Sequence, residues 1–240
     1  MLRWLRFFFN DGQKVTTIDA DPDANLASAL GFPKTSDIIP VTEMKELINE
    51  RTGSSKENYG KFFKLNPTVS DLPDKLAIEH DGIKLISLGA IKRGGGGCAC
   101  PENVFLKALL SHLILRREEV ILIDMEAGIE HLGRGTVEAV DALIVVLEPG
   151  MRSVRTFYQV EKLSKDIGIK TIFAVLNKVA NTRQREVIEK ELKDVPFLGC
   201  ISYNDGVAEA DLMGKSAFDN NEILISETKD ILLNLKERLK

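Results

Sequence analysis

Cysteine is scarce in this sequence, with three residues in 240. So few thiols in a chain of this length argue against a disulfide framework and favour a reducing compartment, so we expect a cytoplasmic protein. Long apolar runs are also missing, since no stretch approaches the ~18 residues that a membrane span requires. Arg3 and Arg6 interrupt the apolar opening and no small-residue cleavage site follows, so we do not interpret it as a targeting segment.

Positive charge is not in excess either. The 32 Lys and Arg residues are outnumbered by 36 Asp and Glu residues, and the net charge is −4. Proteins that bind nucleic acid usually carry a basic patch, so we expect no nucleic-acid partner, and we expect no membrane partner. Hydrophobic residues make up 44% of the chain, enough to bury a full core. Residues 1–240 are therefore predicted to form a single α/β domain.

Strand and helix patterns alternate along most of the chain. This alternation is typical of a mostly parallel, doubly wound sheet with helices on both faces, which makes three layers. Residues 32–82 lack a clear period apart from one amphipathic helix, so we interpret them as an insertion-like excursion from the sheet. Strands are expected at 14–19, 83–88, 120–124, 142–147, 170–176 and 197–201. Helices are expected at about 24–30, 41–51, 151–167, 206–213 and 221–239, with one more beginning at Pro101.

Residues 91–103 hold the most distinctive local pattern, four glycines followed by Cys98-Ala99-Cys100 and Pro101. Two thiols one residue apart can bind the same metal ion, but zinc and nickel thiolate sites usually need four donors. Cys200 cannot supply two more, so we expect a homodimer in which each subunit contributes one C-x-C. Proline fits the first turn of a helix, which would place Cys100 where the helix dipole stabilises a thiolate. A glycine hinge that carries two incidental small residues is the alternative.

Acidic side chains follow two of the predicted strands. Asp19, Asp21 and Asp23 end the first strand, and Asp124 ends the apolar run Val-Ile-Leu-Ile. Open α/β sheets bind ligands at the carboxyl ends of their strands, so these carboxylates could orient Mg²⁺ or a water molecule. A turn with a helix cap would explain one or two of them.

Two further candidates for ligand binding lie near strand ends. Gly128 follows Asp124 at a position where a backbone N–H could approach a γ-phosphate. Asn177 and Lys178 follow the strand expected at 170–176, and an amide beside an ammonium group could read a purine base. An ordinary polar strand end has the same pattern.

These motifs form an ordered set: Asp-x-Asp, Gly-Gly-Gly-Gly-Cys-Ala-Cys-Pro-Glu-Asn, Ile-Asp-Met-Glu-Ala-Gly-Ile-Glu-His and Asn-Lys. The set resembles the CooC-type accessory ATPases that mature nickel carbon monoxide dehydrogenase, which are relatives of the nitrogenase iron protein and of septum-positioning and partition ATPases. The similarity runs from about Gln13 to the C-terminus. It implies a P-loop ATPase that uses ATP and Mg²⁺, dimerises, holds nickel or zinc between its subunits and delivers nickel to the dehydrogenase.

The resemblance also implies roles for single residues. Asp21 resembles the switch I carboxylate near Mg²⁺ and the attacking water, and Asp124 looks like the Walker B acid, so both would be catalytic. The remaining roles, carried over in the same way, are Gly128 as γ-phosphate sensor, Asn177 with Lys178 as adenine-binding residues, and Cys98 and Cys100 as metal ligands.

One motif of this family is missing from the sequence. The family opens with a strand and a phosphate loop of the type K-G-G-x-G-K-[ST], and the sequence contains no G-x-x-x-x-G-K-[ST]. Gly94–Gly97 cannot replace it, because phosphate binding needs a lysine and a hydroxyl after the glycines. We expect the true start to lie upstream or the product to be truncated, and this chain to be deficient in ATP hydrolysis. The sheet is then expected to contain a slot lined by Val15, Ile18, Val120 and Leu122.

Two other functions remain open on the sequence. One is a nickel or zinc chaperone or storage dimer that uses only the C-x-C and no nucleotide. The other is an electron carrier similar to the nitrogenase iron protein, with an iron–sulfur cluster bridging two subunits. The sequence does not distinguish nickel from zinc, since both metals accept four thiolates.

Overall fold

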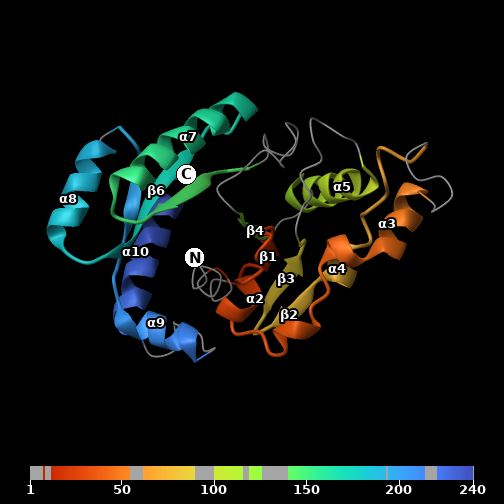
Figure 1. Cartoon of the computed structure of the whole chain (residues 1–240), viewed down its shortest axis with the longest axis horizontal. Coiled ribbons are helices and arrows are strands. Elements are labelled where there is room, and N and C mark those ends of the chain that lie inside the picture. Colours follow the sequence, from red (N-terminus) through yellow and green to blue (C-terminus); the bar gives the residue numbers. More distant parts are fainter. Residues whose placement is uncertain are drawn as a thin grey trace. The chain divides into compact units, whose positions relative to one another are not determined.

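The structure is a computed structural model that describes Phe8 and residues 12–54, 62–89, 100–115, 119–125, 140–192, 194–213 and 221–239. The chain divides into two compact units, and each contains its own β-sheet (Figure 1). The N-terminal unit comprises Phe8–Ser28 and Phe32–Ala139, and the C-terminal unit consists mainly of Val140–Lys240. None of the helices in the described ranges is long and apolar enough to cross a membrane.

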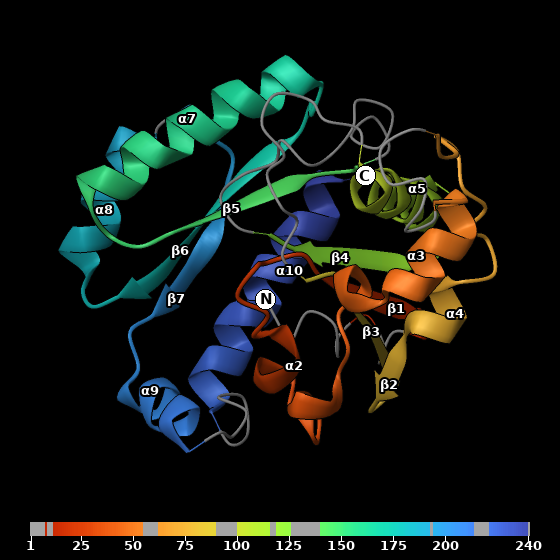
Figure 2. The ribbon, with the colours of Figure 1, turned by 45° about the vertical axis from the view of Figure 1, so that its right-hand side comes forward.

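The sheet of the N-terminal unit contains β1 (Val15–Asp19), β2 (Ile78–His80), β3 (Ile83–Ser87) and β4 (Val120–Asp124). The strand order is β2-β3-β1-β4, with β1 parallel to both neighbours and β2 antiparallel to β3 (Figure 2). Every residue of β1 is buried, and its polar side chains find partners inside the sheet. Thr16 donates to Glu119 Oε2 and Thr17 donates to the carbonyl of Lys84, each at 2.9 Å.

β2 and the turn that joins it to β3 lie within the predicted excursion, and this strand is not expected from the sequence, whereas β3 is the strand expected at 83–88. Asp81 and Gly82 form the turn, with φ of 49° and 76°. Two consecutive left-handed residues match the twist of the flanking strands, which is why Asp-Gly is a preferred two-residue hairpin turn. The excursion therefore returns to the sheet edge as a short antiparallel strand.

Helices of the N-terminal unit begin with α2 (Leu26–Ala29) and the 3₁₀ turns η1 (Thr35–Asp37) and η2 (Val41–Glu43). The α-helices that follow are α3 (Lys45–Thr52), α4 (Pro73–Leu76) and α5 (Pro101–Leu115). The helix expected at 41–51 is therefore split into η2 and α3. α5 is the main core helix, and α3 packs against it. Its buried residues recur at helical spacing: Phe105, Leu106, Leu109, Leu110 and Leu113.

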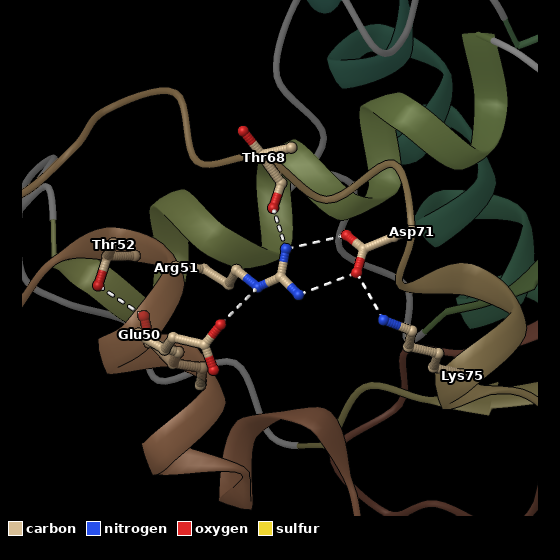
Figure 3. Close-up of polar contacts among 7 residues, drawn as sticks. Glu50, Arg51, Thr52, Thr68, Asp71 and Lys75 are labelled. Atoms are coloured by element: carbon tan, nitrogen blue, oxygen red, sulfur yellow. Dashed lines mark hydrogen bonds and ion pairs between the residues drawn. The ribbon is translucent and has the colours of Figure 1, made fainter.

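A charged cluster within the excursion joins α3 to residues 68–75 (Figure 3). The guanidinium of Arg51 donates to both carboxylate oxygens of Asp71 at 2.9 Å, and to the carbonyl of Thr68 at 3.4 Å. Lys75 Nζ lies 2.8 Å from the same carboxylate. The hydrogen bonds from Arg51, and then from Lys75, hold the pKa of Asp71 well below its usual range. Residues 62–72 contain no helix or strand, so this bidentate pair fixes their path.

The C-terminal unit contains the parallel strands β5 (Leu143–Leu147), β6 (Ile172–Val179) and β7 (Phe197–Ser202) in that order. Its helices are α7 (Met151–Ile167), α8 (Thr182–Glu191), α9 (Asp205–Leu212) and α10 (Glu222–Arg238). α10 packs closely on β7, because a Cβ at Gly199 would lie 2.7 Å from Ile231 Cγ1. The strand expected at 170–176 extends to Val179, so Asn177 and Lys178 lie inside β6 rather than after it.

The sheets confirm the predicted α/β class but correct the expected position of the slot. β1 has a partner on both sides, and Val15 and Ile18 are at most 2% exposed, so β1 lines no opening. Among the described residues β4 lies at an edge of this sheet and pairs with β1 alone, and Val120 and Leu122 are only partly buried. An apolar sequence of this kind normally occupies the middle of a parallel sheet.

Candidate functional site

Asp19 anchors the loop at the carboxyl end of β1. Its side chain is 1% exposed, and its two oxygens accept from the backbone N–H groups of Asp21 at 3.3 Å and Leu26 at 3.1 Å. Burial raises the pKa of Asp19, while these two hydrogen bonds lower it, and burial dominates. Both oxygens are occupied by the chain itself, so Asp19 shapes the loop that presents Asp21.

Asp124 ends β4 directly beside Asp19 in the parallel ladder, and the carbonyl of Asp124 accepts from Ala20 N at 2.9 Å. Burial, together with the negative charges of Asp19 and Asp21, raises the pKa of Asp124 to about 6. Asp21 lies on the same loop and accepts from Asp23 N at 2.8 Å. The structure therefore brings together Asp21 and Asp124, the two residues predicted to be catalytic, around the buried Asp19.

The raised pKa of Asp124 predicts a pH-dependent penalty on stability. The pKa in the fold lies above the ordinary value of 3.8, so the penalty is absent below about pH 4, grows as the pH rises, and is full above about pH 6. The difference between 3.8 and about 6 corresponds to about 3 kcal/mol, which partial exposure to solvent reduces to about 1 to 2 kcal/mol. Asp124→Asn should stabilise the protein by that amount at pH 7.5 without divalent ions.

Urea unfolding at pH 4, 5, 6 and 7.5 measures this effect. The gain from Asp124→Asn over the wild type should shrink as the pH falls and vanish near pH 4. Asp23→Asn, on the neighbouring loop after β1 and exposed to solvent, is the matched control and should change stability little at any of these pH values. A constant difference in stability between Asp124→Asn and the wild type across this range would contradict the raised pKa of Asp124.

The carboxylates of Asp21 and Asp124 suit an Mg²⁺ ion that is bound together with a nucleotide. Within the described ranges, no group of three or more His, Cys, Asp and Glu side chains is arranged to hold a metal. Mg²⁺ commonly takes one or two carboxylates, with phosphate oxygens and water completing its shell. Asp21 and Asp124 supply that number of carboxylates, because both oxygens of Asp19 are already hydrogen-bonded to backbone N–H groups.

Cys100 lies at the N-terminus of α5, as the sequence predicts. Its carbonyl accepts from Val104 N at 3.1 Å, and Asn103 N donates to its Sγ at 3.5 Å. The thiol thus occupies the position of a side-chain cap, facing an N–H group that the helix itself leaves without a partner. Cys98 and Gly128, two other predicted site residues, lie outside the described residues.

Cys200 differs from Cys100 in its surroundings. It lies in β7 of the C-terminal unit and is only partly buried. Burial raises the pKa of the Cys200 thiol, with nearby Arg185 acting in the opposite direction. A thiol that resists ionisation is a poor metal ligand, because metals bind the thiolate.

Asn177 and Lys178 lie near the carboxyl end of β6, in the C-terminal unit. Asn177 Oδ1 accepts from Lys178 N at 3.0 Å, and Lys178 has a φ of 57°, which is rare for a residue with a side chain. Lys178 Nζ also pairs with Glu148 at 2.5 Å, just after β5. With its oxygen turned to its own backbone, Asn177 has its N–H₂ group available as a hydrogen-bond donor for a ligand.

Residues 4–217 match the family described as the CobQ/CobB/MinD/ParA nucleotide binding domain. The chain belongs to this family. It is 43% identical to the carbon monoxide dehydrogenase accessory protein CooC of Rhodospirillum rubrum over 236 residues, which cover 98% of this chain and 89% of that protein. It is also 41% identical to an ATP-binding protein of Methanocaldococcus jannaschii over 214 residues, 88% of this chain and 82% of that protein. These relatives confirm the resemblance to the CooC-type accessory ATPases.

Solved structures of the CobQ/CobB/MinD/ParA family share the fold. The septum site-determining protein MinD of Pyrococcus horikoshii, solved with Mg-ADP, matches with a TM-score of 0.65 and 17% identity over 99% of this chain and 89% of that one. A ParA family ATPase of Chlorobium tepidum gives 0.66 and 19%, covering 98% and 91%. At such low identity these matches show that the chains share a fold.

The sequence does not indicate the role of Asp19. Asp19 was grouped with Asp21 and Asp23 as one of three acids, whereas the structure gives it a distinct role as the buried anchor of the loop. The available signal is its place as the last residue of the β-branched strand, before the turn that carries Asp21 and Asp23.

Proposed function

We propose that this chain is an accessory protein for the maturation of nickel carbon monoxide dehydrogenase. The observation that carries the proposal is the 43% identity to CooC along 98% of the chain, which extends far beyond a shared nucleotide fold. The client enzyme would be the dehydrogenase, and the cargo would be nickel, with zinc as the competing metal.

The proposed metal site uses the C-x-C from each of two subunits. Cys100 sits at a helix N-terminus, where a thiolate interacts favourably with the helix dipole and with Asn103 N–H. Cys98 precedes it by one residue and would bind the same ion. Two such pairs supply the four sulfur donors that nickel and zinc accept, so the site requires a homodimer.

The proposed nucleotide role rests on the strand-end residues. Asp21 and Asp124 would hold Mg²⁺ and orient water, Gly128 would sense the γ-phosphate, and Asn177 with Lys178 would contact the adenine. When bound, Mg²⁺ would neutralise the charge that develops on the phosphate oxygens. Within this chain, Asp19 keeps the Asp21 loop in place through its two backbone hydrogen bonds.

A second candidate function is a nickel or zinc chaperone or storage dimer that works without nucleotide. One observation favours it: no G-x-x-x-x-G-K-[ST] occurs in the sequence, so the main binding element for the phosphates is missing. The two functions share the metal site and differ in whether nucleotide changes metal release.

Activation of nickel-free carbon monoxide dehydrogenase tests the proposal. The dehydrogenase should be mixed with nickel-loaded protein and Mg–ATP, using both this chain and a version preceded by a strand and K-G-G-x-G-K-T. We expect the extended version to restore activity at nickel concentrations where free nickel does not. A Cys98→Ser, Cys100→Ser variant of it is the control. Activation no better than that by free nickel would refute the accessory role, while ATP-independent activation would favour the chaperone function. Iron found by metal analysis of the purified protein, together with visible absorption, would point instead to an iron–sulfur cluster.

A further inference from the structure

The ladder between β6 and β7 contains a bulge near the carboxyl ends of both strands. Leu176 pairs with Cys200, and Val179 pairs with Ser202. Between these pairs, two residues of β6 stand opposite one residue of β7. Backbone bonding continues beyond the bulge, where Tyr203 N donates to the carbonyl of Val179 at 3.0 Å. A bulge redirects side chains relative to the regular alternation of a strand, and bulges are frequent next to functional sites.

Asn177 and Lys178 are the two residues of this bulge, and neither has a counterpart in β7 within the described ladder. Lys178 has a φ of 57°, and its backbone N–H donates to Asn177 Oδ1 at 3.0 Å. An N–H group can bond only to the oxygen of a side-chain amide, so this bond fixes which way the amide of Asn177 is turned. The bulge therefore sets the orientation of the side chain that would contact the base.

The amide of Asn177 keeps one function toward a ligand. Its oxygen is occupied, and among the described residues no acceptor bonds to its N–H₂ group, on a residue that is only partly buried. A free asparagine recognises adenine with both groups, accepting from the 6-amino group and donating to N7. Asn177 can only donate, so the atom of the base that suits it is the acceptor N7.

We propose that Asn177 recognises a purine base by donating to N7 alone, and that Lys178 is the positioning residue that holds Asn177 in this orientation. Lys178 Nζ pairs with Glu148 at 2.5 Å, but both side chains are 58% exposed and such a pair contributes little. The orientation of Asn177 thus depends on the left-handed backbone of Lys178. This inference rests on the adenine role proposed above and narrows it, because Asn177 makes the contact and Lys178 acts through it.

Nucleosides test the proposal with the chain as it stands, because they carry no phosphate and do not need the phosphate loop. The probes are adenosine, 7-deazaadenosine, which has a C–H group in place of N7, and purine riboside, which lacks the 6-amino group. Each is titrated into the protein and followed by NMR. We expect 7-deazaadenosine to bind about five- to tenfold more weakly than adenosine, because one hydrogen bond is lost. Purine riboside should bind within about twofold of adenosine, because the oxygen of Asn177 is not free to accept from the amino group.

Variants of the bulge separate the contact from its positioning. Asn177→Asp keeps an oxygen for Lys178 N and removes the donor, so it should bind adenosine and 7-deazaadenosine equally. Asn181→Asp is the matched control with the same change in charge, because Asn181 Oδ1 also accepts a backbone N–H, from Gln184 at 3.0 Å. It should discriminate as the wild type does. Lys178→Gly permits the left-handed conformation and should also discriminate, whereas Lys178→Val, with a β-branched side chain, disfavours it and should not.

Equal binding of adenosine and 7-deazaadenosine by the wild type would overturn the proposal, and so would discrimination that survives in Asn177→Asp. A loss of affinity for purine riboside as large as that for 7-deazaadenosine would show that the oxygen of Asn177 faces the base, which also contradicts it. Unchanged discrimination in a folded Lys178→Val would remove the positioning role, and the Asn177→Asp comparison decides the contact even if Lys178→Val does not fold.

The triphosphates of the same three nucleosides, measured with the version preceded by a strand and K-G-G-x-G-K-T, distinguish this failure from that of the proposed function. If neither version binds any of the nucleosides or triphosphates, the adenine role itself fails and the inference fails with it. Binding of all three triphosphates with equal affinity would contradict the N7 contact alone and leave the nucleotide role in place.

Discussion

Replacing either Cys98 or Cys100 by serine is expected to abolish stoichiometric metal binding, from about one metal ion per two chains to none. A serine hydroxyl stays protonated near neutral pH and replaces a thiolate poorly as a ligand for zinc or nickel. A site with four sulfur donors, two from each subunit, would lose two of them with each substitution. Metal content after gel filtration, measured by mass spectrometry, gives the stoichiometry.

Cys200→Ser is the matched control for these variants. Cys200 lies in the C-terminal unit, and burial disfavours its thiolate, so its replacement should leave the metal content unchanged. The serine variants of the C-x-C should also elute as monomers under conditions in which the metal-loaded protein is a dimer. Wild-type metal content in both Cys98→Ser and Cys100→Ser would rule out the proposed ligands.

ATP hydrolysis by this chain is expected to be indistinguishable from buffer. The phosphate loop supplies the N–H groups and the lysine that hold the β- and γ-phosphates, and the sequence lacks this motif. The carboxylates of Asp21 and Asp124 would repel the phosphates without it. A version preceded by an apolar strand and K-G-G-x-G-K-T should bind Mg–ATP and hydrolyse it.

Phosphate release and fluorescent-nucleotide titration measure the two steps separately. In the extended version, Asp124→Asn should abolish hydrolysis and largely spare nucleotide binding, because the phosphate loop provides most of the affinity. Asp23→Asn, on the neighbouring loop after β1, again serves as the control. Robust turnover by the 240-residue chain that depends on Asp124 would reveal a phosphate site elsewhere in the sequence.

The elements with the strongest local patterns could be predicted closely from the sequence. β4 and α7 match their predicted bounds. Each is marked by a pattern of adjacent residues: an uninterrupted apolar run for β4, and an amphipathic run that ends at Gly168 for α7. Helix α2 is shorter than expected, since only Leu26–Ala29 is helical in the segment 24–30. Asp19 accounts for the late start, because its carboxylate accepts the N–H of Leu26.

Properties that depend on distant residues could not be predicted. The split of the helix at 41–51 into η2 and α3 depends on Leu88, whose carbonyl accepts from Thr42 N. Which strand lies at the edge of the sheet depends on the strand order. Strand order cannot be read from any short stretch of the sequence. The pKa of Asp124 depends on its register beside Asp19, and that register appears only when the ladder is formed.

The one-sided pairing of β4 has a practical consequence for work with this protein. A strand edge presents a row of N–H and C=O groups that another chain can pair with, and its apolar side chains make such pairing favourable in water. A net charge of −4 spread over 240 residues supplies little mutual repulsion between molecules. Concentration and ionic strength during purification would therefore govern how long the protein remains dispersed, independently of any effect of metal or nucleotide on its assembly.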